Sequence, residues 1–184
     1  GISQDSQEAV KWYQLAADQG NTEAQSSLGE IYAKGKGISQ DSQEAVKWYQ
    51  LAADQGNIEA QSSLGEMYAK GQGVSQNSQE AVKWYILAAE QGSTEAQYNL
   101  GEMNAKGQGV SKNSQEAVKW YHRAAEQGNI EAQSSLGAMY AEGTGVEKNY
   151  KEAIKWFISA AKENDSNSQC YLANMYIKGL GVSV

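Results

Sequence analysis

Carboxylate pairs spaced three residues apart are the side chains of this chain best suited to chemistry. They occur at Asp5 and Glu8 and again at Asp41 and Glu44, and two acids within reach of one substrate can act as general acid and general base. A related spacing returns at Asn77/Glu80, Asn113/Glu116 and Asn149/Glu152. Because the pattern recurs in the same local sequence, we interpret it as a set of helix N-caps. In a capping box the first residue accepts a backbone amide and the glutamate bonds back to it.

The other reactive side chains stand alone. His122 is the only histidine and Cys170 the only cysteine, so neither belongs to a metal-binding or nucleophile–base constellation. The pair Gly35-x-Gly37 recurs in every unit and follows no strand, so we expect it to form a turn and not a phosphate loop. We therefore predict no catalytic residue, no metal ligand and no cofactor.

These residues are carried by a 36-residue unit that occurs five times, beginning at Gly1, Gly37, Gly73, Gly109 and Gly145. The first two units differ only at Thr22/Ile58, Ile31/Met67 and Lys36/Gln72. Self-similarity at this period indicates a solenoid, in which each unit buries its apolar face on its neighbours. No linker or charge block interrupts the period, so we predict one continuous array over residues 1–184.

Apolar spacing predicts two helices in each unit, with no strand anywhere. In one of them Ala24 and Leu28 share a face, and the helix begins at Asn21, a good N-cap residue. Gly29 lies beside Leu28 in the middle of this helix, where glycine disfavours the helix by about 1 kcal/mol relative to alanine. Its recurrence therefore predicts that a partner helix approaches closely at this point.

Three motifs together resemble those of Sel1-like repeat proteins, which are relatives of tetratricopeptide repeats. The motifs are Leu28-Gly29-x-x-Tyr32, Gly35-x-Gly37-Ile38 and Ala45-x-x-Trp48-Tyr49-x-x-Ala52-Ala53-x-x-Gly56. The resemblance implies an all-α fold, a right-handed α/α superhelix of about ten antiparallel helices. In the phase of the family, the chain opens with a second helix at 5–19 and closes with a lone first helix at about 166–178. Four complete pairs lie between them, at about 21–55, 57–91, 93–127 and 129–162, and we expect the chain to be part of a longer protein.

The resemblance also implies a non-catalytic scaffold that binds a protein or peptide on a concave face lined by the first helices. By similarity to tetratricopeptide repeats, that face carries two acidic columns: Glu23, Glu59, Glu95 and Glu131 in one, and Glu30, Glu66 and Glu102 in the other. Such a ladder favours a basic or amide-rich extended segment. Alternatively, the first column offsets the helix dipoles, and the second pairs with lysines four residues later.

The third and last units depart most from the repeat. Tyr98, Asn99, Glu102 and Asn104 form our candidate contact cluster, because tyrosine is a frequent interface anchor and asparagine can pair with a peptide backbone. Tyr171 is a further candidate in the last unit. Neutral drift is the alternative explanation for these differences.

Composition limits the partners. The net charge of −7 and the pI near 4.8 argue against nucleic acid and anionic membranes, which bind basic surfaces. No apolar run approaches the roughly 18 residues of a membrane span, so we expect a soluble chain, either periplasmic or secreted or cytoplasmic. Two alternatives to a scaffold are end-to-end self-association through exposed terminal helices and a cell-wall-glycan or enzyme-associated module. The last would need a polar constellation confined to one unit, and none is present.

Overall fold

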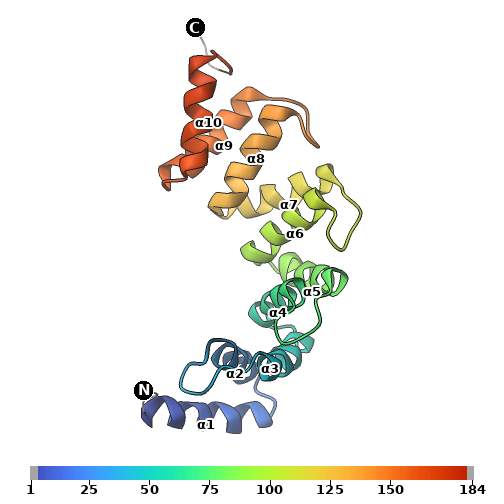
Figure 1. Ribbon diagram of the computed structural model, residues 1–184, viewed down its shortest axis with the longest axis vertical. Coiled ribbons are helices and arrows are strands. Elements are labelled where there is room, and N and C mark those ends of the chain that lie inside the picture. Colours follow the sequence, from blue (N-terminus) through green and yellow to red (C-terminus); the bar gives the residue numbers. More distant parts are fainter. Residues whose placement is uncertain (1–3, 182–184) are drawn as a thin grey trace. The chain divides into compact units, whose positions relative to one another are not determined.

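The computed structural model describes residues 4–181, which form ten α-helices and no strand (Figure 1). The helices are α1 (Gln4–Asp18), α2 (Thr22–Lys34), α3 (Ser42–Asp54), α4 (Ile58–Lys70), α5 (Ser78–Glu90), α6 (Thr94–Lys106), α7 (Ser114–Glu126), α8 (Ile130–Glu142), α9 (Tyr150–Lys162) and α10 (Ser166–Ile177). We call the even-numbered helices first helices and the odd-numbered ones second helices. The predicted all-α class, built from 36-residue helical repeats, is confirmed.

The helices form two compact units. The first contains α1 to α5 and ends at Ser93, and the second begins at Thr94 and contains α6 to α10. Within each unit, every helix packs on the next one in sequence, and the contact from a first helix to the following second helix is the most extensive. That both units continue a single array stays a prediction.

The first helices begin and end as their sequences predict. Asn21 precedes α2, and its side-chain oxygen accepts a hydrogen bond from the Ala24 amide at 2.9 Å. Gly35 ends this helix with φ of +68°, a conformation that glycine adopts without strain from a Cβ atom, and its N–H donates to Ile31 O at 2.8 Å. The same cap and the same terminal glycine recur in α4 and α8.

The second helices begin with half of the predicted capping box. The Asp41 side chain accepts hydrogen bonds from the amides of Gln43 and Glu44, both at 3.0 Å. The predicted return bond from Glu44 is wrong, because the Asp41 N–H donates instead to Tyr32 O of the preceding first helix, at 2.9 Å. The Glu44 carboxylate pairs with Lys47 at 2.6 Å. Each cap therefore also fastens a second helix to the first helix before it.

This inter-helix bond recurs with asparagine caps, from the amides of Asn77, Asn113 and Asn149 to the carbonyl oxygens of Tyr68, Asn104 and Tyr140. The first box of the chain differs. Helix α1 begins at Gln4, which places Asp5 inside the first turn and not at the N-cap. Our interpretation of Asp5 as an N-cap is therefore wrong.

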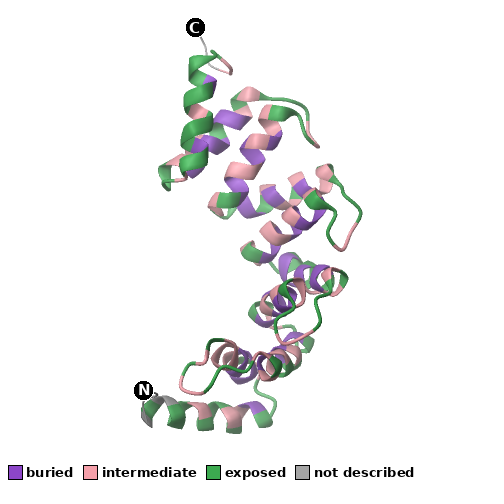
Figure 2. Ribbon diagram, viewed as in Figure 1, coloured by how far each residue is buried: buried purple, intermediate pink, exposed green. Residues whose placement is uncertain are grey.

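Each glycine in the middle of a first helix faces an aromatic ring, as its recurrence predicts. A Cβ atom on Gly29 would lie 2.5 Å from the ring of Tyr49 in the following second helix. The corresponding pairs are Gly65 and Tyr85, Gly101 and Tyr121, and Gly137 and Phe157, and in each a ring atom lies within 2.8 Å of the place that a Cβ atom would take. The leucine before each glycine is almost completely buried, and Figure 2 shows the buried residues along the sides where consecutive helices meet. Close approach at glycine therefore sets the spacing inside each helix pair.

A buried glutamine near the start of a first helix accepts a hydrogen bond from an exposed glutamine at the end of the following second helix. Gln25 donates to Ala17 O at 3.1 Å and accepts from the side-chain amide of Gln55 at 2.6 Å. The same glutamine-to-glutamine bond joins Gln91 to Gln61 and Gln127 to Gln97. Glu163 occupies the repeat position of the donor glutamines Gln55, Gln91 and Gln127. Its carboxylate has no N–H to donate, and the side-chain oxygen of the buried Gln133 has no hydrogen-bond partner.

Helix α1 exposes the face that the other second helices bury. Tyr13 is 41% exposed, whereas the corresponding Tyr49 of α3 is 5% exposed. A mostly apolar hollow of about 480 Å³ lies along this face, lined by Ala9, Trp12, Tyr13, Ala16, Asn21, Glu23 and Ala24. This face is an open apolar surface of the first unit.

Candidate protein-binding surface

The first predicted acidic column lies on exposed positions of the first helices. Glu23, Glu59, Glu95 and Glu131 are exposed, and each lies in the first turn of its helix. Within residues 4–181, Glu23, Glu59 and Glu131 form no ion pair. A carboxylate at this place offsets the positive end of the helix dipole, and the exposed oxygens of Glu23, Glu59 and Glu131 are accessible to a partner.

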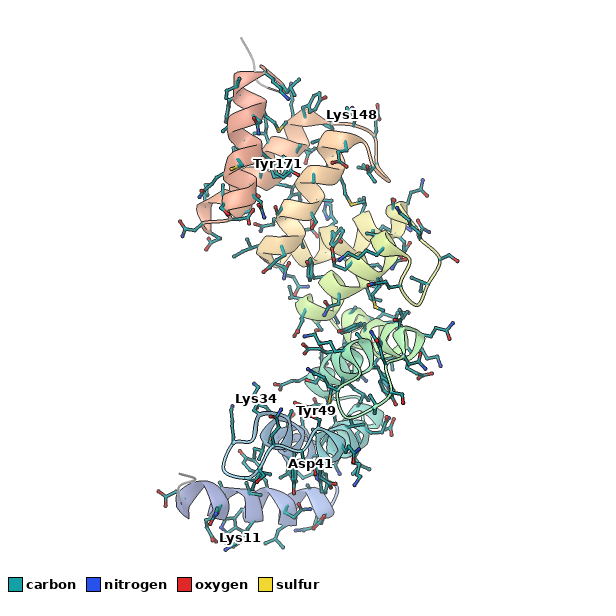
Figure 3. All side chains as sticks on the ribbon, viewed as in Figure 1. Lys11, Lys34, Asp41, Tyr49, Lys148 and Tyr171 are labelled. Atoms are coloured by element: carbon teal, nitrogen blue, oxygen red, sulfur yellow. The ribbon has the colours of Figure 1, made fainter. Side chains whose placement is uncertain are left out.

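The second column is paired within its own helices, as the alternative interpretation predicts. The Glu30 carboxylate receives the ammonium groups of Lys34 (labelled in Figure 3) and Lys36, both at 2.8 Å. These hydrogen bonds lower the pKa of Glu30 to about 2. Glu66 pairs with Lys70 and Glu102 with Lys106 in the same way. The lysines offset much of the negative charge of this column.

Glu102 has a second donor besides Lys106, on the following second helix. The Tyr121 hydroxyl of α7 donates to its carboxylate at 2.5 Å. Burial raises the pKa of Glu102, but the hydrogen bonds from Lys106 and Tyr121 outweigh burial, so the pKa lies below its ordinary value. Burial, followed by the bond to Glu102, raises the pKa of the Tyr121 hydroxyl. Glu102 is therefore a fixed anion held from two sides.

Tyr98 lies directly beside this pair. Its half-buried ring packs against the ring of Tyr121, with centroids 5.9 Å apart and planes inclined by 40°. Burial raises the pKa of Tyr98, and the nearby charges of Glu102 and Glu131 raise it further. We call Tyr98, Glu102, Tyr121 and Glu131 the Tyr98 cluster. It joins side chains of α6, α7 and α8.

The two asparagines of the candidate cluster differ in exposure. Asn99 is half-buried and follows Tyr98 in α6. Asn104 is only 8% exposed, and its side-chain amide donates to Leu100 O at 2.9 Å. This burial argues against Asn104 as a direct contact, contrary to our expectation that its amide would pair with a bound peptide.

Tyr171 lies on α10, in the last repeat (Figure 3). It is 44% exposed, and its ring stacks on Phe157 with centroids 4.8 Å apart and planes within 8° of parallel. A hollow of about 330 Å³ adjoins it, lined by Ala141, Tyr150, Tyr171, Asn174, Met175, Lys178 and Leu180. The structure thus separates Tyr171 from the Tyr98 cluster and gives it different neighbours.

The isolated reactive side chains acquire no constellation in the described part of the chain. His122 packs edge-on against Trp156 at 5.4 Å, and its Nδ1 lies 3.4 Å from the Glu126 carboxylate. Cys170 is exposed. Between residues 4 and 181, no three side chains of the His, Cys, Asp and Glu types gather as metal ligands, and no helix has the length and apolar character needed to cross a membrane.

Tyr121 is the member of the Tyr98 cluster that the sequence analysis missed. The repeats do contain a signal for it. Glutamate accompanies tyrosine in the pairs Glu30/Tyr49, Glu66/Tyr85 and Glu102/Tyr121, and the one repeat with alanine in place of the glutamate has Phe157, which has no hydroxyl. The carboxylate and the hydroxyl are thus lost in the same repeat, and in Glu102/Tyr121 the two are partners of one hydrogen bond.

Comparison with known proteins gives one family. The family model described as Sel1 repeat matches residues 1–21, 22–57, 58–93, 94–129, 130–165 and 166–184. No curated protein matches the chain.

Three solved structures illustrate the likeness. The chain is 42% identical, with a TM-score of 0.95, to c5321, a protective antigen of uropathogenic Escherichia coli strains displaying an SLR fold; the match covers 98% of this chain and 39% of that one. For a Sel1 repeat protein from Oxalobacter formigenes the identity is 39%, the TM-score 0.86 and the coverage 96% and 75%. Helicobacter pylori cysteine rich protein B is 23% identical with a TM-score of 0.57, over 72% of this chain and 95% of that one, which shows a shared fold alone.

Proposed function

Because the chain belongs to the Sel1 repeat family, we propose that it is a non-catalytic scaffold that binds a protein or peptide segment along the exposed sides of its first helices. Proteins of this family are generally protein-interaction scaffolds. The chain spans 39% of the length of the E. coli antigen and 75% of that of the Oxalobacter protein. The proposal therefore concerns the repeats of this chain and not the additional length of those proteins.

The observation that supports this proposal best is the exposed carboxylate column of Glu23, Glu59, Glu95 and Glu131. These acids return every 36 residues on successive first helices, and Glu23, Glu59 and Glu131 form no ion pair within residues 4–181. Regularly spaced anions complement an extended segment rich in basic or amide side chains. The net charge of −7 favours the same class of partner over nucleic acid.

A quantitative pull-down with two matched variants tests the scaffold. In one variant Glu23, Glu59 and Glu131 become glutamine, which removes three charges from the first helices. The control replaces three exposed acids of the second helices, as Asp54→Asn, Glu90→Gln and Glu126→Gln. We expect a protein captured by the wild type and by the control, with capture by the first-helix variant reduced about tenfold or more at low salt. Equal capture by both variants, or no captured protein, would overturn the proposal.

Self-association is a second candidate, favoured by the open face of α1. The contact between α2 and α3 buries the corresponding face of α3. Helix α10 is itself a first helix with exposed apolar residues, of which Tyr176 is 54% and Ile177 83% exposed. If α10 of a second copy covered α1, the contact would be heterologous and would not need to close, so it would produce chains of molecules.

Ala173 provides a sharp test of this second candidate. It stands where the four preceding first helices have the glycine that faces an aromatic ring. Reuse of the internal geometry would bring its Cβ against Tyr13, so Ala173→Gly should strengthen association and Tyr13→Glu should abolish it. Light scattering over a wide concentration range measures both effects. A monomeric mass for the wild type and for Ala173→Gly would exclude self-association by this contact.

A further inference from the structure

Tyr98 is the aromatic member of a column that otherwise has small side chains, at Ser26, Ser62, Ser134 and Cys170. In the Tyr98 cluster this ring packs on Tyr121 and lies close enough to Glu102 and Glu131 to be influenced by both charges. No hydrogen bond to the Tyr98 hydroxyl occurs within the part of the chain that the structure describes. The cluster thus combines an aromatic ring with two carboxylates on the surface proposed for binding.

The first unit contains a matched arrangement without the ring. Ser26, Glu30, Tyr49 and Glu59 occupy the repeat positions of Tyr98, Glu102, Tyr121 and Glu131. After burial, the charges of Glu30 and Glu59 raise the pKa of Tyr49, just as the charges of Glu102 and Glu131 raise the pKa of Tyr98. Ser26 is 5% exposed and offers no surface. The two sites therefore differ in a single aromatic side chain and in their lysines.

The lysines make the net charge of the two sites unequal. Glu30 pairs with both Lys34 and Lys36, whereas Glu102 pairs with Lys106, and residue 108 is a glutamine. In the first unit two carboxylates therefore face two ammonium groups. In the Tyr98 cluster two carboxylates face one ammonium group, which leaves one negative charge without an internal partner.

We propose that the Tyr98 cluster is a subsite for a basic side chain, arginine foremost, of the segment that the scaffold binds. A guanidinium group can lie over the exposed part of the Tyr98 ring while its N–H groups donate to Glu131. Glu102 is already held by Tyr121 and Lys106, so it contributes its charge and keeps its place. This inference rests on the proposed scaffold function, and it specifies the chemistry of one contact.

Arginine suits this geometry better than lysine. Its guanidinium is planar, stacks on aromatic rings and donates from several N–H groups at once, whereas the lysine ammonium is compact and strongly hydrated. The subsite should therefore prefer arginine over lysine and should discriminate strongly against citrulline, which has nearly the same shape and no charge.

Nuclear magnetic resonance titration of the whole chain with N-acetyl-arginine methylamide tests the subsite directly. The lysine and citrulline analogues serve as matched probes. We expect amide shifts at Tyr98, Glu102 and Glu131 that saturate with arginine and fade with added salt. Residues Ser26 and Glu59 provide an internal control and should respond at least about threefold more weakly, since their site lacks the ring.

Two variants separate the ring from a general effect on folding. Tyr98→Ser installs the residue found at this position in three other repeats, and it should weaken arginine binding about fivefold. Tyr98→Phe keeps the ring and should retain binding. Thermal melting checks that both variants fold. Equal responses of the two units, equal binding of citrulline or unchanged binding by Tyr98→Ser would overturn the subsite.

The outcomes also separate the subsite from the scaffold function. A protein that is captured equally by the wild type and by Tyr98→Ser, while depending on Glu23, Glu59 and Glu131, would refute the subsite and support the scaffold. Arginine binding that Tyr98→Ser removes, in a chain that captures no protein, would support the subsite chemistry and refute the scaffold.

Discussion

The ring of Tyr85 occupies the space that a side chain on Gly65 would need, because a Cβ atom there would lie 2.7 Å from Cδ1 of the ring. Gly65 lies in α4 and Tyr85 in α5, and both residues are buried. We expect Gly65→Val to force the two helices apart and to lower the free energy of unfolding by about 3 kcal/mol. Thermal or urea unfolding measures this loss.

Ala173→Val is the matched control for that prediction. Ala173 holds the same repeat position in α10, and its side chain is exposed. There valine should change stability by no more than about 0.7 kcal/mol, the range of ordinary helix propensities. Similar losses from both substitutions would show that helix propensity, and not close packing on tyrosine, explains the recurrent glycine.

Glu163→Gln should stabilise the second unit. Glutamine at this position would supply the donor that Gln133 lacks, as Gln127 does for Gln97 at 2.7 Å. Satisfying a buried acceptor contributes about 1 kcal/mol, which urea unfolding can resolve. The reverse change, Gln127→Glu, should lower stability by a similar amount. No gain from the first substitution together with a loss from the second would contradict the idea that Gln133 needs a donor.

Asp41 and Glu44 should have unequal effects on stability. Asp41 caps α3 with two hydrogen bonds from backbone amides, so Asp41→Ala should destabilise by about 1 kcal/mol. Asp41→Asn should be nearly neutral, because asparagine caps α5, α7 and α9. Glu44 makes only an exposed pair with Lys47, so Glu44→Ala should cost about 0.5 kcal/mol or less. A lower denaturant midpoint for Glu44→Ala than for Asp41→Ala would contradict this order and support the reciprocal capping box.

Glu30 should make stability depend on pH in the acid range. Its pKa is lowered from 4.5 to about 2 by hydrogen bonds from Lys34 and Lys36. Because the pKa of Glu30 is lower in the folded chain than in the unfolded chain, the ionised carboxylate stabilises the fold at any pH above about 4.5. This contribution disappears as the pH falls from about 4.5 to about 2. Glu30→Gln should therefore lose part of the acid sensitivity that urea unfolding shows for the wild type. Glu23→Gln, which removes an exposed acid without a lysine partner, should retain that sensitivity.

The sequence predicted the helices well, because their signals are local. The first-helix caps, Gly35 at the end of α2 and the apolar positions all lie within one unit, and repetition made each of them easy to recognise. The return bond from Glu44 was wrong because it competes with a bond from the Asp41 amide to Tyr32, and that bond exists only once two helices have packed.

The candidate site was predicted less completely, because its geometry depends on residues far apart in the sequence. Tyr98 meets Tyr121 only through the packing of α6 on α7. Asn104 has the chemistry of a peptide contact, but the helix turns it inward, where it donates to Leu100. The pairing of glutamate with tyrosine in successive repeats was a readable signal, since Phe157 loses its hydroxyl in the repeat where alanine replaces the glutamate.

The glutamine bonds between first and second helices have a consequence for the gene. Each joins residues 30 positions apart, as in the pairs Gln55/Gln25, Gln91/Gln61 and Gln127/Gln97, and the first two units differ at only three places. Recombination between such similar stretches would add or delete a whole number of 36-codon segments. A junction between two units that both carry the glutamines would regain the same hydrogen bonds, so the array could gain or lose such units without a change in its interior.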